Sequence, residues 1–121
     1  MCEATRRKVL IADYDRDVAR SLRMVFEREG FEVKLGHDSE SVLAATVDWR
    51  PDVAILDYIL ADLNGIACGD KLRERYPDCK VIVLHSAFAD HWIEDAQKRG
   101  YEVISKPVPA EVLLSAANAH P

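Results

Sequence analysis

Short apolar runs rich in β-branched residues alternate with amphipathic helical patterns five times along the chain. We expect strands at residues 9–12, 31–35, 53–56, 81–84 and 103–104. Runs such as VLIA and VIVL are apolar on both sides, which favours a parallel sheet with helices on both faces. Alternation of this kind predicts right-handed crossovers and a doubly wound sheet.

The helical patterns each carry an apolar stripe and end at residues that stop helices. The expected helices cover residues 15–29, 39–47, 65–76, 90–99 and 110–119. Gly30 and Gly100 follow two of them, and Pro77 follows a third. The prediction is an α/β chain, (βα)5 and flavodoxin-like, with one domain over residues 1–121. Of the two common strand orders, 2-1-3-4-5 fits a sheet of five strands.

The composition of the chain limits which partners and which cellular location we expect. Lys and Arg number 16 against 21 Asp and Glu, a formal charge of −5, so a direct nucleic-acid partner is not expected. No apolar run approaches the roughly 20 residues that span a bilayer, and no secretory signal is present. The three cysteines lack any metal-ligand spacing and are interpreted as reduced thiols. We therefore expect a cytoplasmic domain with no membrane partner.

Four polar residues stand where apolar runs stop: Asp13, Asp57, Ser86 and Lys106. The carboxyl ends of parallel strands meet at one edge of a sheet, where ligands gather. In the order 2-1-3-4-5, Asp13 and Asp57 face each other across the switch point. Two acids, a hydroxyl and a lysine there suit a phosphoryl group and a divalent cation. The plainer interpretation is that a strand-end Asp only caps a helix, which applies most to Asp13.

Four segments in order resemble the receiver domain of bacterial two-component response regulators. KVLIADYDRDVARSL is similar to the first strand and acidic loop, and PDVAILDYILADLNG to the segment around the phosphoryl-accepting aspartate. VIVLHSA is similar to the strand that ends in the hydroxyl residue, and ISKPV to the strand that ends in the lysine. Each segment alone is weakly specific, but together they span nearly the whole chain.

The resemblance implies that Asp57 takes a phosphoryl group from a histidine kinase or a histidine phosphotransfer protein. It implies Mg²⁺ held by Asp13, Asp57 and the backbone carbonyl of Ile59. Lys106 would neutralise one phosphoryl oxygen and Ser86 would bond another. The chain would then be a self-phosphorylating acceptor rather than a turnover enzyme. Its signal would reach a downstream protein or output domain through the fourth helix, fifth strand and fifth helix, the face that a homodimer would also use.

The sequence departs from the family pattern beside the expected site. Receivers usually have two adjacent acids after the first strand, but here Tyr14 follows Asp13. A neutral phenol in place of a carboxylate predicts weak magnesium binding and slow or conditional phosphorylation. Val103 stands where many receivers have an aromatic residue that swings inward. Ile59 and Phe88 flank the expected phosphoryl site, and their apolar cover predicts a long-lived acyl phosphate.

Two other functions remain open at this point. Tyr14 and Val103 favour a divergent pseudo-receiver, a protein-interaction module that does not need phosphorylation. The run Asp13-Tyr14-Asp15 is also similar to the DxD motif of haloacid dehalogenase phosphohydrolases. That family needs an acidic motif after the lysine and a cap domain, whereas only Glu111 follows Lys106 here. We therefore rank the phosphoacceptor first, the pseudo-receiver second and the hydrolase last.

Overall fold

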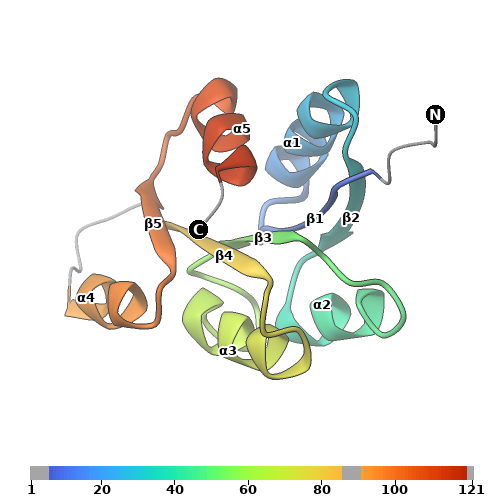
Figure 1. Ribbon diagram of the computed structural model, residues 1–121. Helices are drawn as coiled ribbons and strands as arrows, with labels where there is room; N and C mark the ends of the chain where they lie inside the picture. The colour runs from blue at the N-terminus through green and yellow to red at the C-terminus, as the bar shows by residue number, and fades with distance from the viewer. Residues whose placement is uncertain (1–5, 86–90, 120–121) are drawn as a thin grey trace.

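Five parallel strands and five helices make up the part of the chain that the computed structural model describes, residues 6–85 and 91–119 (Figure 1). The strands are β1 (Lys8–Ala12), β2 (Glu32–Gly36), β3 (Val53–Asp57), β4 (Lys80–His85) and β5 (Glu102–Ser105). The helices are α1 (Arg16–Arg28), α2 (Ser39–Ala45), α3 (Gly65–Arg75), α4 (His91–Lys98) and α5 (Ala110–Asn118). The predicted (βα)5 alternation is confirmed.

The strand order is β2-β1-β3-β4-β5, as the sequence predicts. Strand β1 lies between β2 and β3, with Ala12 paired to Leu56 at the end of the β1–β3 ladder. The residues that follow this pair, Asp13 and Asp57, therefore emerge side by side at the carboxyl edge. The next strand, β4, runs parallel to β3 and pairs Leu84 with Asp57.

Helices cover both faces of the sheet. Figure 1 shows α1 and α5 on one face and α2, α3 and α4 on the other. Alternate strand residues bury their side chains on opposite faces: Leu10 and Leu56 on the α2–α4 side, Ile11 and Ile55 on the α1–α5 side. All four are essentially inaccessible to water, and a fully buried side chain of this size contributes about 1.5–3 kcal/mol. Packing on both faces explains why the strand runs lack alternation.

A close backbone approach fixes the turn from β3 into α3. The backbone nitrogen of Gly65 donates to the carbonyl oxygen of Tyr58 at 2.8 Å. A Cβ placed on Gly65 would lie 2.6 Å from the backbone oxygen of Asp57. Only glycine allows this contact without displacing the strand end. The turn then enters α3 with the Asn64 side chain accepting from the nitrogen of Ala67 as the N-cap.

The ends of the helices and strands differ from the expected ends by no more than two residues. Helix α1 begins at Arg16 because the Asp15 side chain is its N-cap, accepting from the nitrogens of Asp17 and Val18. Asp13 is thus not the cap of this helix. Helix α2 ends at Ala45, where the Thr46 hydroxyl turns back to bond a carbonyl oxygen of the last turn. Within residues 6–85 and 91–119, no helix has both the length and the apolar character to cross a membrane.

Candidate active site

One lysine joins two buried carboxylates at the carboxyl edge of the sheet. The Nζ atom of Lys106 lies 3.0 Å from Oδ2 of Asp13 and 2.9 Å from Oδ2 of Asp57. Asp13 is 2% exposed and Asp57 is 7% exposed. The structure thus brings together three of the residues that the sequence analysis selected, from strands that are far apart in the chain.

Backbone contacts hold each member of this group. Asp57 is the last residue of β3, and Lys106 follows β5, where its nitrogen donates to the carbonyl oxygen of His85 at 2.7 Å. The Lys106–Pro107 peptide bond is cis. The nitrogen of Asp15 donates to Oδ1 of Asp13 at 2.8 Å, and the nitrogen of Ile59 donates to Oδ1 of Asp57 at 3.2 Å. Each carboxylate oxygen therefore has one donor and keeps lone-pair capacity for a ligand.

The charges of the group perturb one another. Burial raises the pKa of the Asp57 carboxyl, the hydrogen bond from Lys106 opposes the rise, and the charge of Asp13 adds to it. Burial alone would lower the pKa of Lys106, but its hydrogen bonds to Asp57 and Asp13 raise that pKa above the ordinary value. The lysine is therefore a permanent cation at neutral pH. Its positive charge offsets negative charge on the neighbouring carboxylates.

The oxygen atoms present fit a hard divalent cation, with fewer acids than the sequence pattern of the family would supply. Tyr14 is 65% exposed, and the Asp15 carboxylate is committed to capping α1. Among residues 6–85 and 91–119, no three His, Cys, Asp or Glu side chains converge as a metal-binding group. Asp13, Asp57 and the carbonyl oxygen of Ile59 are the candidate ligands, a set of hard oxygens that suits Mg²⁺.

Two of the selected residues, Ser86 and Phe88, lie outside the described residues. Ile59, whose backbone nitrogen contacts Asp57, has 60% of its surface exposed. Cys68 and Cys79 are buried in the core, and burial raises the pKa of each thiol to about 12. Neither thiol is therefore a nucleophile at neutral pH.

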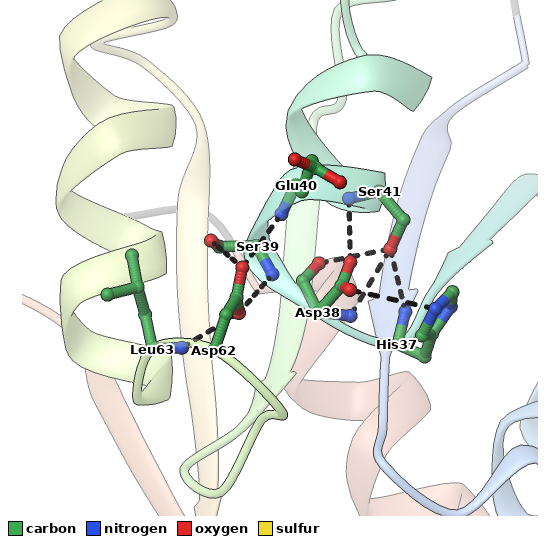
Figure 2. Close-up of polar contacts among 7 residues, drawn as sticks. All are labelled: His37, Asp38, Ser39, Glu40, Ser41, Asp62 and Leu63. Carbon is green, nitrogen blue, oxygen red and sulfur yellow. Dashed lines mark hydrogen bonds and ion pairs between the residues drawn. The ribbon is translucent and has the colours of Figure 1, made fainter.

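A second polar cluster, which the sequence analysis missed, ties the loop after Asp57 to helix α2 (Figure 2). Oδ1 of Asp62 accepts from the nitrogen of Ser39 at 2.8 Å, and Oδ2 accepts from the Ser39 hydroxyl at 2.7 Å and from the Glu40 nitrogen at 3.2 Å. These bonds lower the pKa of Asp62. The same carboxylate accepts from the nitrogen of Leu63 at 2.7 Å. Asp62 thereby supplies acceptors for the first turn of α2 from another loop.

The start of α2 also has its own cap. The Asp38 side chain accepts from the nitrogen of Ser41 at 2.7 Å, and the Ser41 hydroxyl accepts from the nitrogen of Asp38 at 3.2 Å. This reciprocal pair is a capping box. Asp38 is therefore the N-cap of α2.

An aromatic contact involves the residue that follows Asp57 in the chain. The rings of Tyr58 and Trp92 are stacked, with centroids 3.9 Å apart and planes 6° from parallel. Trp92 is buried and belongs to the core on the α2–α4 side of the sheet. His85 meets the edge of Trp92 at 5.4 Å.

Comparison with known proteins decides the family. Residues 9–118 match the family described as the response regulator receiver domain. The chain belongs to this family. Its curated relatives include the probable transcriptional regulatory protein TcrX of Mycobacterium tuberculosis, 31% identical over 107 residues. That alignment covers 88% of this chain and 46% of TcrX, so the chain spans about half the length of this relative.

Solved structures agree with the receiver fold. The CheY-like receiver domain protein from Methanospirillum hungatei has a TM-score of 0.86 and 25% identity, covering 93% of this chain and 90% of that protein. A response regulator from Burkholderia pseudomallei, with a phosphorylated aspartic acid, a calcium ion and citrate, has a TM-score of 0.85 and 23% identity over 93% of this chain and 67% of that protein. Membership supports a two-component phosphoacceptor role and favours it over a pseudo-receiver. Receivers of this family bind Mg²⁺ at their acidic pocket.

Proposed function

We propose that Asp57 of this receiver accepts a phosphoryl group, with Asp13, Lys106 and Ser86 as the residues that support the transfer. The observation that carries the proposal is the contact of Lys106 Nζ with both buried carboxylates, at 2.9 and 3.0 Å. A cation held at this place can neutralise a phosphoryl oxygen without reorganisation. The same lysine also offsets the repulsion between Asp13 and Asp57 in the resting protein.

The transfer forms one bond and breaks one. An oxygen of the Asp57 carboxylate bonds to phosphorus while the bond from phosphorus to the donor imidazole nitrogen breaks. The electron pair of that bond leaves with the imidazole, and the product is a mixed carboxylic–phosphoric anhydride. A carboxylate is a weak nucleophile, so positioning and charge neutralisation supply most of the rate. The backbone bonds to Asp57 and Lys106 supply that positioning.

Asp13, Asp57 and the carbonyl oxygen of Ile59 would hold Mg²⁺. When bound, the ion supplies charge neutralisation for the phosphoryl oxygens. The calcium ion and phosphorylated aspartic acid of the Burkholderia pseudomallei protein are consistent with this assignment. Because Tyr14 is an exposed phenol and Asp15 caps α1, this site has one carboxylate fewer than the family pattern. We propose that its magnesium affinity is correspondingly low.

The phosphoryl donor would be a histidine kinase or a histidine phosphotransfer protein. The whole protein would pass the signal to an output domain or a downstream protein, since relatives such as TcrX are about twice as long as the matched region. A homodimer would use the face of α4, β5 and α5. The domain over residues 1–121 would work in the cytoplasm.

Tyr14 is the specific observation in favour of the second function, the phosphorylation-independent interaction module. It removes a charge and a ligand from the metal site. Against that function, the Asp13–Lys106–Asp57 geometry is intact, and an interaction module would not need it.

Intact mass after incubation with acetyl phosphate and excess Mg²⁺ tests the proposal. We expect a phosphate-sized gain on the native chain and none on Asp57→Ala. Asp48→Ala is the matched control, because Asp48 is an exposed aspartate in the connection between α2 and β3. No gain on the native chain, even at high magnesium, would contradict the phosphoacceptor function. If Tyr14→Asp then restored the gain, this one residue would account for the loss.

A further inference from the structure

The stack of Tyr58 on Trp92 joins the phosphoryl-acceptor strand to helix α4. Tyr58 is the residue after Asp57, and Trp92 is the second residue of α4. Near-parallel planes at 3.9 Å bring the two ring faces into full contact. Since Trp92 is 7% exposed, the contact is shielded from water and its geometry is held by the surrounding core.

Hydrogen bonds hold the backbone of Tyr58 on both sides. A displacement of Asp57 is therefore not absorbed by free movement of the Tyr58 backbone. Its nitrogen donates to Leu84 of β4 at 2.8 Å, and its carbonyl oxygen accepts from Gly65 of α3 at 2.8 Å. Both oxygens of Asp57 are in use, one with Ile59 and one with Lys106. Attaching phosphorus to either oxygen adds a bulky, charged group beside these bonds, at the strand end that carries the Tyr58 ring.

Among the described residues, the ion pair that attaches helix α4 to α3 lies near the carboxyl end of α4. Arg99, the residue after α4, pairs with Asp70 of α3 at 3.0 Å and with Asp95 of α4 at 2.7 Å. The Tyr101 hydroxyl donates to the same Asp70 at 2.6 Å. A groove of about 420 Å³ runs along the two helices, and Tyr58 and Trp92 line it together with Asp70 and Arg99. Arg99 anchors the carboxyl end of α4 to α3, and the Tyr58–Trp92 stack contacts the amino end.

We propose that Tyr58 is a positioning residue that transmits phosphorylation of Asp57 to helix α4 through its stacked contact with Trp92. The inference rests on the proposed phosphoacceptor function. It also gives this chain an aromatic link to α4 although Val103, in β5, has no ring. The His85 ring, against the edge of Trp92, ties the end of β4 to the same contact.

Tryptophan fluorescence can report on the stack and on a distant position separately, because the chain has two tryptophans and each can be kept alone. Trp49→Phe leaves Trp92 as the reporter of the stack. Trp92→Phe leaves Trp49, whose ring nitrogen donates to Glu32 at 2.7 Å, as the remote control. On treatment with acetyl phosphate and Mg²⁺, we expect the emission of the Trp92-only protein to change and that of the Trp49-only protein to stay constant.

Tyr58→Leu in the Trp92-only protein should abolish the emission change, and Tyr58→Phe should keep it, because phenylalanine retains the stacking ring. Intact mass is recorded for every variant, so a missing phosphoryl group is read separately and counts against the proposed function alone. A full emission change in a phosphorylated Tyr58→Leu protein would overturn the coupling. A phosphorylated Trp92-only protein with constant emission would overturn it as well.

Hydrogen exchange tests the same contact without any phosphoryl group. Loss of an aromatic pair should speed exchange of the amides of α4, residues His91–Lys98, by about two- to tenfold in Tyr58→Leu. Exchange in α1 should be unchanged, and Tyr58→Phe should match the native protein. Equal exchange in α4 for Tyr58→Leu and the native protein would contradict the proposal even if Asp57 is never phosphorylated.

Discussion

Lys106 donates to Asp57 at 2.9 Å, and both side chains are largely withdrawn from water. The pair links the last residue of β3 to the residue after β5, on opposite sides of β4. Because Asp13 shares the same lysine, we propose that the cation has both a structural and a chemical role in this receiver. The two roles can be separated by substitution.

Lys106→Met should lower the free energy of unfolding by about 1–3 kcal/mol, since it leaves two buried carboxylates without their cation. Urea denaturation at neutral pH measures this effect. Adding Asp13→Asn to Lys106→Met should recover part of the loss, because one of the repelling charges is gone. Acetyl phosphate should label neither protein. Equal stability of Lys106→Met and the native protein would show that the contact contributes little to folding.

Tyr14→Asp should raise the affinity for Mg²⁺ by about tenfold. A third carboxylate near the ion adds about 1–4 kcal/mol of attraction at 4 Å, depending on the effective dielectric constant. Titration followed by tryptophan emission gives the affinity. Tyr14→Asn is the matched neutral control and should bind magnesium like the native protein. Binding by the native chain as tight as that of ordinary receivers, or no gain from Tyr14→Asp, would refute the role assigned to Tyr14.

The stabilising contribution of Asp62 should be lost in acid. Hydrogen bonds from Ser39 lower the pKa of Asp62 on folding. A lowered pKa stabilises the folded state above the unfolded value, and that contribution is lost as pH falls below about 4 toward the folded pKa. Asp62→Asn should therefore unfold with a weaker pH dependence in this range. Asp48→Asn, at an exposed aspartate of the α2–β3 connection, serves as the control, and identical acid profiles for all three proteins would contradict the assignment.

Ile59→Asn should shorten the lifetime of the phosphorylated protein. We expect the apolar side chain of Ile59 to hinder water from reaching the acyl phosphate, and an amide in its place to orient a water molecule instead. The side chain is 60% exposed, so the substitution should leave folding largely unchanged. Loss of the phosphate mass over time measures the lifetime. Fast loss from the native chain, at the same rate as from Ile59→Asn, would reject the shielding role.

Most of the fold could be predicted from the sequence because each element carries its own local signal. The β-branched runs and the stops at Gly30 and Pro77 gave strand and helix positions within one or two residues. Asp13, Asp57 and Lys106 could be placed together because the strand order brings the carboxyl ends into one edge. The predicted roles of these residues stay predictions until phosphorylation is measured.

The side-chain contacts between distant elements could not be predicted from such local signals. The bond of Asp62 to Ser39 joins residues 23 positions apart, and it depends on the path of the β3–α3 loop rather than on any periodic pattern. The sequence carried no signal for the ring on which Trp92 stacks. Such partners follow from rotamers and loop geometry, which only tertiary packing decides.

The glycine at position 65 never touches the reacting atoms, yet its hydrogen in place of a side chain lets the backbone of Asp57 lie where it does. Random mutagenesis scored by signalling output would therefore rank Gly65 among the most intolerant positions, beside the acids themselves. A map of mutational sensitivity drawn on this protein would outline the shape of a turn as sharply as the site of phosphoryl transfer.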